Sequence, residues 1–169
     1  MSDNAFQLFD LEPTWHVDLV ELEKIYKTKQ LQYHPDRMVR ATEDKKKQAE
    51  AQAAMINQAY ETLKSPIKRA ELLLSLRHID VSDETIHDSS LLQEMFELQE
   101  ELMSVPTRER IIELKQDVQS RFESTEHLFS EGLGHQTPDL LKLNLHRLRY
   151  LDKLRVLCDQ VLNSSPGNR

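Results

Sequence analysis

The stretch YHPDR, residues 33–37, places an imidazole and a carboxylate on either side of a proline. His34 and Asp36 are residue types that bind metal ions and act as catalytic acids and bases. Their side chains stand two positions apart across the rigid Pro35 and are expected to diverge. The other histidines of the chain show no HxxxH-type spacing that would complete a ligand set. A metal-dependent hydrolase built on His34 and Asp36 is therefore the least favoured hypothesis, and we expect no metal, no cofactor and no catalytic activity.

The proline itself indicates a different use for this stretch. A loop that only connects two helices would be expected to contain Gly, Asn or Ser. Pro35 fixes the backbone, which lowers the entropy that is lost when a partner docks. Asp36 can accept hydrogen bonds from an arginine, while Lys24 and Lys27 on the preceding segment can donate to carboxylates. The sequence therefore favours a protein-docking surface.

Two predicted helices must position this loop. Asp18 can cap the first, with Glu21 three residues on in the place of a capping box. That helix should end near Tyr33, because a residue before a proline avoids helical geometry. Thr42 can cap the second. The predicted inward-facing residues are Leu19, Leu22, Tyr26 and Tyr33 in the first helix and Ala49, Ala53, Ile56, Tyr60 and Leu63 in the second. An antiparallel hairpin with His34-Pro35-Asp36 in its loop is expected.

The rest of the chain also predicts helices. A short one precedes Pro13, and another spans 68–76 after the break at Ser65-Pro66. Residues 77–90 are polar and rich in helix-capping residues, so we expect domains at 1–76 and 77–169. Three apolar stripes of helical spacing follow, punctuated by Pro106 and the turn at 132–134. The sequence thus predicts an all-α protein whose second domain is an antiparallel three-helix bundle.

One segment of the second domain carries more apolar residues than a bundle core needs. The stripe expected to fill the core consists of Leu91, Met95, Leu98 and Leu102. Leu92 and Phe96 form a second apolar pair on a neighbouring face, followed by Glu97, Glu100 and Glu101. For Leu92 alone, a wide core face explains the pattern about as well as an exposed patch does. Both residues together, bordered by carboxylates, favour an exposed protein-binding patch.

Composition restricts the partners. The net charge is −7, and residues 77–169 carry 17 acidic against 11 basic side chains. This balance disfavours nucleic acid as a partner. No apolar run approaches the roughly 20 residues of a membrane span, and the N-terminus lacks signal or transit features. We therefore expect no membrane partner and a bacterial cytoplasmic location. Cys158 is the only cysteine, and it is expected to be buried.

The segments IYKTKQLQYHPDR and INQAYETLKSPIKRAE resemble the J-domain of the DnaJ family. That resemblance implies that His34, Pro35 and Asp36 engage a seventy-kilodalton heat-shock ATPase and stimulate its hydrolysis of ATP. Lys24 and Lys27 would face an acidic surface of that ATPase, with Gln30 in the same patch. Lys29 stands where J-domains usually carry a leucine, and its aliphatic stem is expected to cover the core.

The continuation, through SPIKRAELLLSL, LLQEMFELQEELMSV and LRYLDKLR, resembles the HscB family of iron–sulfur co-chaperones. The resemblance implies an L-shaped protein whose C-terminal bundle binds an IscU-type scaffold and targets it to an HscA-type ATPase. The scaffold-binding residues that it implies are Leu92, Phe96, Glu97, Glu100 and Tyr150. This sequence departs from the family's pattern at two positions. Gln93 stands where a methionine is familiar, and Phe96 stands where a leucine is expected. The alternative hypothesis is a J-domain co-chaperone of the same ATPase class that serves a different client.

Overall fold

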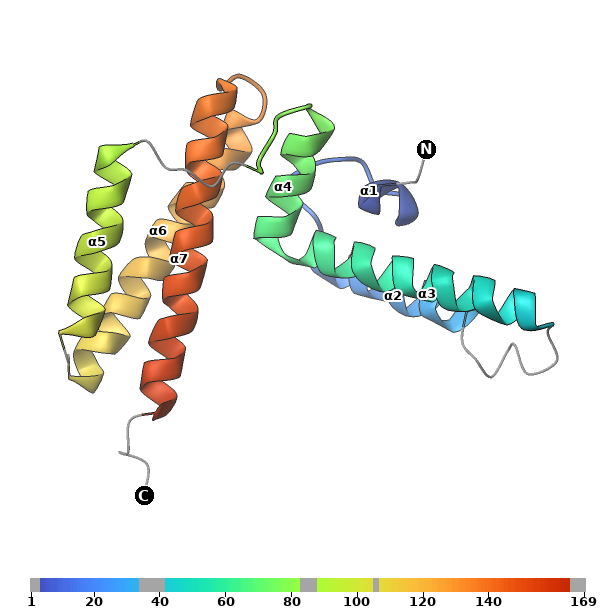
Figure 1. Cartoon of the computed structure of the whole chain (residues 1–169), viewed down its shortest axis with the longest axis horizontal. Helices are drawn as coiled ribbons and strands as arrows, with labels where there is room; N and C mark the ends of the chain where they lie inside the picture. The colour runs from blue at the N-terminus through green and yellow to red at the C-terminus, as the bar shows by residue number, and fades with distance from the viewer. Residues whose placement is uncertain (1–3, 34–41, 83–87, 105–106, 165–169) are drawn as a thin grey trace. The chain divides into compact units, whose positions relative to one another are not determined.

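The computed structural model describes residues 4–33, 42–82, 88–104 and 107–164. These residues form seven α-helices and no β-strand, which confirms the all-α prediction. The chain divides into two compact units, Met1–His78 and Ile79–Arg169 (Figure 1). Each unit is described by itself below. No helix within the described ranges combines the length and the apolar character needed to cross a membrane.

The described part of the first unit contains four helices, α1 (Ala5–Leu8), α2 (Leu19–Gln32), α3 (Glu43–Lys64) and α4 (Pro66–Leu76). α2 and α3 lie side by side and antiparallel, while α1 and α4 pack against α3 (Figure 1). The predicted hairpin is therefore present. The large side chains that fill its core are Phe6, Phe9, Leu22, Ile56, Leu63, Leu73 and Leu74.

The ends of α2 follow the local chemistry of the sequence. The Asp18 carboxylate accepts hydrogen bonds from the backbone N–H groups of Val20 and Glu21, at 2.9 and 3.1 Å. These bonds satisfy backbone N–H groups of the first helical turn, which have no acceptor within the helix. Tyr33 ends α2 as predicted. The expectation that Leu19 faces inward is wrong, since it is 49% exposed. Leu19 is the first residue of the helix, and Leu22, nearly one turn later, fills the core instead.

Aromatic and polar contacts join α2 to α3. The rings of Tyr26 and Tyr60 stack with their centroids 4.1 Å apart. The Tyr26 hydroxyl donates to the side-chain oxygen of Asn57 at 2.9 Å. Lys29 is largely covered, as expected for a lysine in a leucine position, and its ammonium lies 3.2 Å from the carboxylate of Asp10. The hairpin is thus fixed by side chains near the middle and the loop end of α2.

The corner between α3 and α4 is closed by an arginine. Ser65 and Pro66 interrupt the helix, because proline cannot donate to a carbonyl of the preceding turn. The Leu63 carbonyl near the end of α3 accepts a hydrogen bond from the buried Arg69 guanidinium at 2.7 Å. The same guanidinium lies 4.8 Å from the centre of the Trp15 ring, a cation–π distance. Arg69 therefore links the α3–α4 corner to the loop before α2.

The second unit contains α5 (Ser89–Met103), α6 (Arg108–Gly132) and α7 (Pro138–Ser164), which run antiparallel in sequence order (Figure 1). Its core consists of apolar side chains from all three helices, and these are buried: Leu91, Leu98, Leu102, Ile111, Leu114, Val118, Phe122, Phe129, Leu141, Leu145, Leu148, Leu151, Leu154 and Cys158. Met95, which was also predicted to fill the core, is only half-buried. The predicted three-helix bundle is confirmed. Burial raises the pKa of the Cys158 thiol, with the neighbouring Asp159 adding to the shift, so this cysteine is a core residue as predicted.

Candidate functional site

The predicted ATPase-docking loop, with His34, Pro35 and Asp36, lies outside the described residues. Its two anchoring points are described: Tyr33 is the last residue before it, and Thr42 is the N-cap of α3. The roles assigned to the three loop residues stay predictions.

The two lysines predicted to flank this loop are exposed on α2. Lys24 and Lys27 are three residues apart, so they share one face of the helix. Their ammonium groups lie 3.2 Å from the Glu21 carboxylate and 2.8 Å from the Glu23 carboxylate, respectively. Hydrogen bonding and charge attraction within the second pair lower the pKa of Glu23 and raise the pKa of Lys27. Both lysines are therefore presented to solvent with an acidic partner already beside them.

Gln30 has different surroundings from the two lysines. Its side-chain amide donates to the Asn57 oxygen that also accepts from Tyr26. The side chain is half-buried. Gln30 thus bridges α2 and α3. The docking role predicted for Gln30 would require contact with the ATPase through the exposed portion of the residue.

In the second unit, the predicted scaffold-binding residues of α5 lie outside the bundle core. Leu92 is 46% exposed and Phe96 is 67% exposed, whereas Leu91 and Leu98 are buried. Core packing therefore leaves the second apolar face of α5 uncovered. Glu97 and Glu100 are exposed on the same helix. We call Leu92, Phe96, Glu97 and Glu100 the α5 patch.

Gln93, the position that departs from the familiar methionine, interacts with a member of this patch. Its amide donates to the Glu97 carboxylate at 2.8 Å, one helical turn away. Gln93 therefore orients an acidic group of the patch, which the methionine expected at this position could not do.

Tyr150, predicted from the last helix, reaches from α7 to α5. Its hydroxyl donates to the backbone carbonyl of Met95, directly before Phe96. Burial raises the pKa of Tyr150, and the nearby Glu94 carboxylate raises it further. The hydroxyl therefore remains a donor at neutral pH. Tyr150 is half-buried, so it joins the two helices and also stays partly accessible to solvent.

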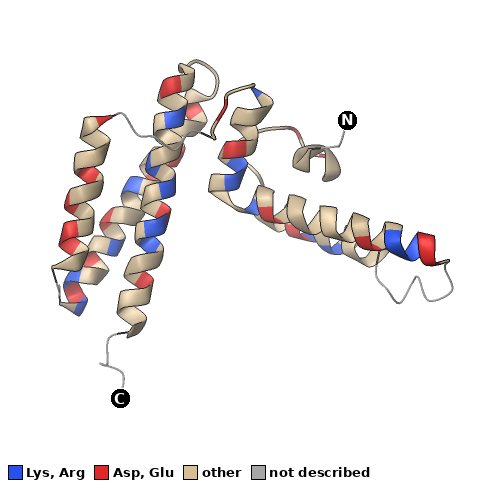
Figure 2. Cartoon of the chain, viewed as in Figure 1, with Lys and Arg blue, Asp and Glu red and all other residues tan. Residues whose placement is uncertain are grey.

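A charge cluster that the sequence analysis missed holds α5 to the other two helices. The two oxygens of Glu94 each lie 2.9 Å from a guanidinium nitrogen, one of Arg121 on α6 and one of Arg147 on α7. Glu101 forms a further ion pair, with Arg110 of α6 alone. Figure 2 shows the acidic residues along α5 and the basic residues of α6 and α7. The partners are far apart in sequence, so no local spacing could have indicated them.

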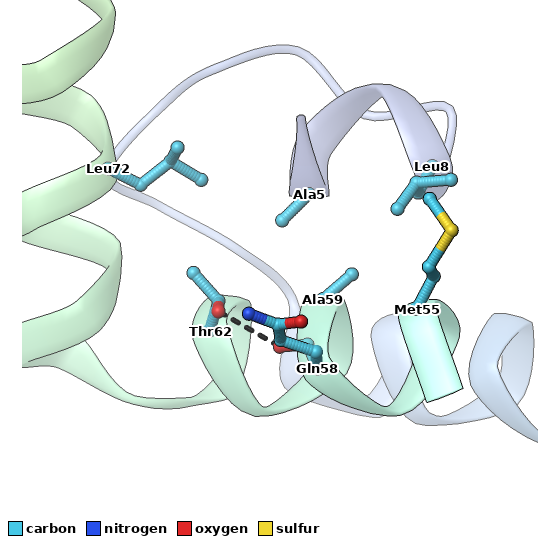
Figure 3. Close-up of a pocket in the computed structure, with 7 residues that line it drawn as sticks. All are labelled: Ala5, Leu8, Met55, Gln58, Ala59, Thr62 and Leu72. Atoms are coloured by element: carbon cyan, nitrogen blue, oxygen red, sulfur yellow. Dashed lines mark hydrogen bonds between the residues drawn. The ribbon is translucent and has the colours of Figure 1, made fainter. Parts of the chain in front are cut away.

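Two features of the described residues concern a metal site and a pocket with acid–base groups. They contain no group of three or more His, Cys, Asp or Glu side chains placed to hold a metal ion. A pocket of about 320 Å³ lies between α1, α3 and α4 (Figure 3). Its lining residues are Ala5, Leu8, Met55, Gln58, Ala59, Thr62 and Leu72. None of these side chains is a carboxylate, imidazole, thiol or amine, so the pocket supplies no general acid or base.

Comparison with known protein families identifies both units. Residues 4–72 match the DnaJ domain, and residues 87–157 match the HSCB C-terminal oligomerisation domain. The first match defines a J-domain protein. The two matches together show that the chain belongs to the HscB family of J-domain co-chaperones, as its resemblance to that family predicted.

Solved structures agree with this assignment. Chaperone HscB from Vibrio cholerae is 29% identical, with 95% of this chain and 98% of that chain covered and a TM-score of 0.85. Human co-chaperone HscB is 23% identical over 95% of this chain and 82% of that one, with a TM-score of 0.89. The Jac1 co-chaperone from Saccharomyces cerevisiae is 22% identical over 99% and 100% of the two chains, with a TM-score of 0.78. The last two comparisons establish the shared fold.

Proposed function

We propose that this co-chaperone binds an IscU-type iron–sulfur scaffold, targets it to an HscA-type heat-shock ATPase and stimulates hydrolysis of ATP. It would thereby promote transfer of the cluster to acceptor proteins in the bacterial cytoplasm. The chain itself would catalyse no reaction. The observation that carries this proposal is the presence of a DnaJ domain and an HscB C-terminal domain in one chain.

The first unit supplies the ATPase contact in this proposal. Lys24 and Lys27 are exposed on α2 and suit an acidic partner surface. The His34-Pro35-Asp36 loop follows directly after that helix in the sequence. In this proposal Pro35 limits the backbone entropy that docking costs, and the exposed lysines of α2 add charge attraction.

The second unit supplies the scaffold contact. Leu92 and Phe96 remain exposed although the core of the bundle is already filled. Glu97 and Glu100 border them and favour a partner that carries lysine or arginine around an apolar surface. Tyr150 borders the same helix from α7.

Holding both partners at once gives the chain its effect. A scaffold tethered to one unit is present at a high effective concentration for an ATPase bound to the other. Co-chaperone and scaffold together should therefore stimulate the ATPase more than the sum of their separate effects.

The experiment for this proposal separates the two contacts. In the double variant Leu92→Ala/Phe96→Ala, affinity for a purified IscU-type scaffold should fall more than tenfold, because exposed aromatic and aliphatic anchors dominate such interfaces. Stimulation of the ATPase without scaffold should be unchanged. Val156→Ala, which removes another exposed apolar side chain of the same unit, is the matched control. If wild-type protein stimulates the ATPase but does not bind the scaffold, the client is a different protein.

A further inference from the structure

The exposed apolar face of α5 extends beyond the α5 patch. Met103 is 71% exposed, more than either Leu92 or Phe96. It follows Phe96 by seven residues and therefore lies on the same side of the helix. At a rise of 1.5 Å per residue, Leu92 and Met103 are separated by about 16 Å along the helix axis. The face is thus about three turns long.

Gln99 occupies the interval between Phe96 and Met103. Its amide nitrogen lies 3.9 Å from the Met103 sulfur, within the range of a weak hydrogen bond. Gln99 therefore lies along the same face and connects the two apolar ends. We call Leu92, Phe96, Gln99 and Met103 the α5 stripe.

Packing inside the bundle does not explain the stripe. Leu91, Leu98 and Leu102 are buried on a neighbouring face of the helix, which packs toward the bundle core. Single exposed apolar residues are common on proteins, and Val156 of α7 is an example. The positions three and four residues from Val156 are polar, namely Asp152, Lys153, Asp159 and Gln160. The α5 stripe differs because three large apolar side chains follow one another on one face.

Charge restricts what can cover the stripe. α5 contains no lysine or arginine, and Glu97 and Glu100 are exposed on it. A second copy of the chain packed along the same stripe would bring like charges together, which is unfavourable. A segment with apolar residues bordered by lysine or arginine would be attracted instead. The charge pattern therefore favours a different, basic partner segment over self-association.

From these observations we infer that the whole α5 stripe binds an amphipathic, basic segment of the scaffold, with Met103 as an additional contact at its far end. Such a segment needs apolar side chains over about 16 Å to cover the stripe. This inference rests on the proposed function and makes it more specific, because it sets the length and the charge of the scaffold segment.

The test is calorimetric titration of full-length variants with the purified scaffold. Met103→Ala should weaken binding about fivefold, a typical loss for a contact residue outside the centre of an interface. Met103→Leu should bind like wild type, since it keeps the apolar volume, and Val156→Ala should also bind like wild type. Raising the salt concentration should weaken wild-type binding, and it should do so less in Glu100→Gln.

Three outcomes would overturn the inference in distinguishable ways. If Phe96→Ala weakens binding but Met103→Ala does not, the contact ends at the α5 patch and the proposed function survives. If wild-type protein does not bind the scaffold at all, the proposed function fails together with this inference. If analytical ultracentrifugation shows a dimer that Met103→Ala dissociates, a second copy of the chain covers the stripe instead.

Discussion

At the scale of single residues, the lysines predicted to meet the ATPase are already engaged within α2. Lys24 pairs with Glu21 and Lys27 pairs with Glu23. Both pairs are exposed, so each contributes little to stability. Each pair must nevertheless open, or accept a third charge, when an acidic surface approaches. The two glutamates therefore reduce the attraction that the lysines can exert on the ATPase.

The substitution Glu23→Gln should strengthen docking to the ATPase. Lys27 would lose its acidic partner, and its raised pKa would return toward the ordinary lysine value. The concentration of co-chaperone needed for half-maximal ATPase stimulation should fall about twofold, in line with the strength of an exposed helical pair. Glu50→Gln, on α3, is the control for a general change of charge. Unchanged or weaker stimulation in Glu23→Gln would show that the pair does not compete with the partner.

Tyr150 combines a structural and a predicted binding role, and two substitutions separate them. Tyr150→Phe removes only the hydrogen bond to the Met95 carbonyl of α5, whereas Tyr150→Ala also removes the ring. The first should lower the free energy of unfolding of the bundle by about 1 kcal/mol and reduce scaffold binding slightly. The second should reduce binding severalfold further. Equal binding by the two variants, measured by calorimetry, would contradict a contact role for the ring.

At the scale of helices, the sequence was informative because the apolar spacing and the capping residues are local. The predicted caps Asp18 and Thr42 both precede helices, and the stripes predicted for α6 and α7 are buried except at Val161, which is half-buried. Leu19 was assigned wrongly because spacing alone does not show which turn of a helix reaches the core. The exposure of Leu92 and Phe96 could be predicted from their excess over the core stripe.

The attachment of α5 could not be predicted in the same way. Glu94 contacts Arg121 and Arg147, and Tyr150 contacts the Met95 backbone, so every one of these contacts joins different helices. Such pairs depend on how the helices pack against one another, and the spacing of residues within one helix does not indicate that packing. These polar contacts supplement the buried leucines in holding the helix that carries the predicted scaffold site.

We predict that Glu94→Gln destabilises the second unit and loosens α5. The variant loses the carboxylate between two guanidinium groups and leaves Arg147 partly buried without its partner. The expected cost is about 1 kcal/mol, at the upper end for exposed pairs. This loss of stability can be measured by the reaction of Cys158 with a thiol reagent at increasing urea concentrations. Cys158 is the only cysteine, and it is buried in the second unit.

The matched control for this prediction is Glu113→Gln, which breaks an exposed pair within α6. It should cost only a few tenths of a kcal/mol. Trp15 fluorescence reports separately on the first unit and should be unchanged in both variants. Equal thiol exposure in Glu94→Gln and wild type would mean that the buried leucines alone hold α5.

At the scale of the whole molecule, the proposed function depends on having two binding units in one chain. The J-domain unit carries exposed lysines on α2, and the bundle carries an exposed apolar face on α5. The class of both units was predictable from motifs that extend along most of the chain, whereas the charge cluster around Glu94 was not. Separating the two units should therefore preserve each binding activity but abolish the synergy between scaffold and co-chaperone.

The most direct test of this account is steady-state ATP hydrolysis by the HscA-type ATPase, with co-chaperone and IscU-type scaffold added separately and together. We predict that the wild-type chain and the scaffold together stimulate hydrolysis beyond the sum of their separate effects. His34→Gln should abolish stimulation by the chain while leaving scaffold binding intact. Equal stimulation by wild type and His34→Gln, or no stimulation by the wild-type chain, would contradict the account.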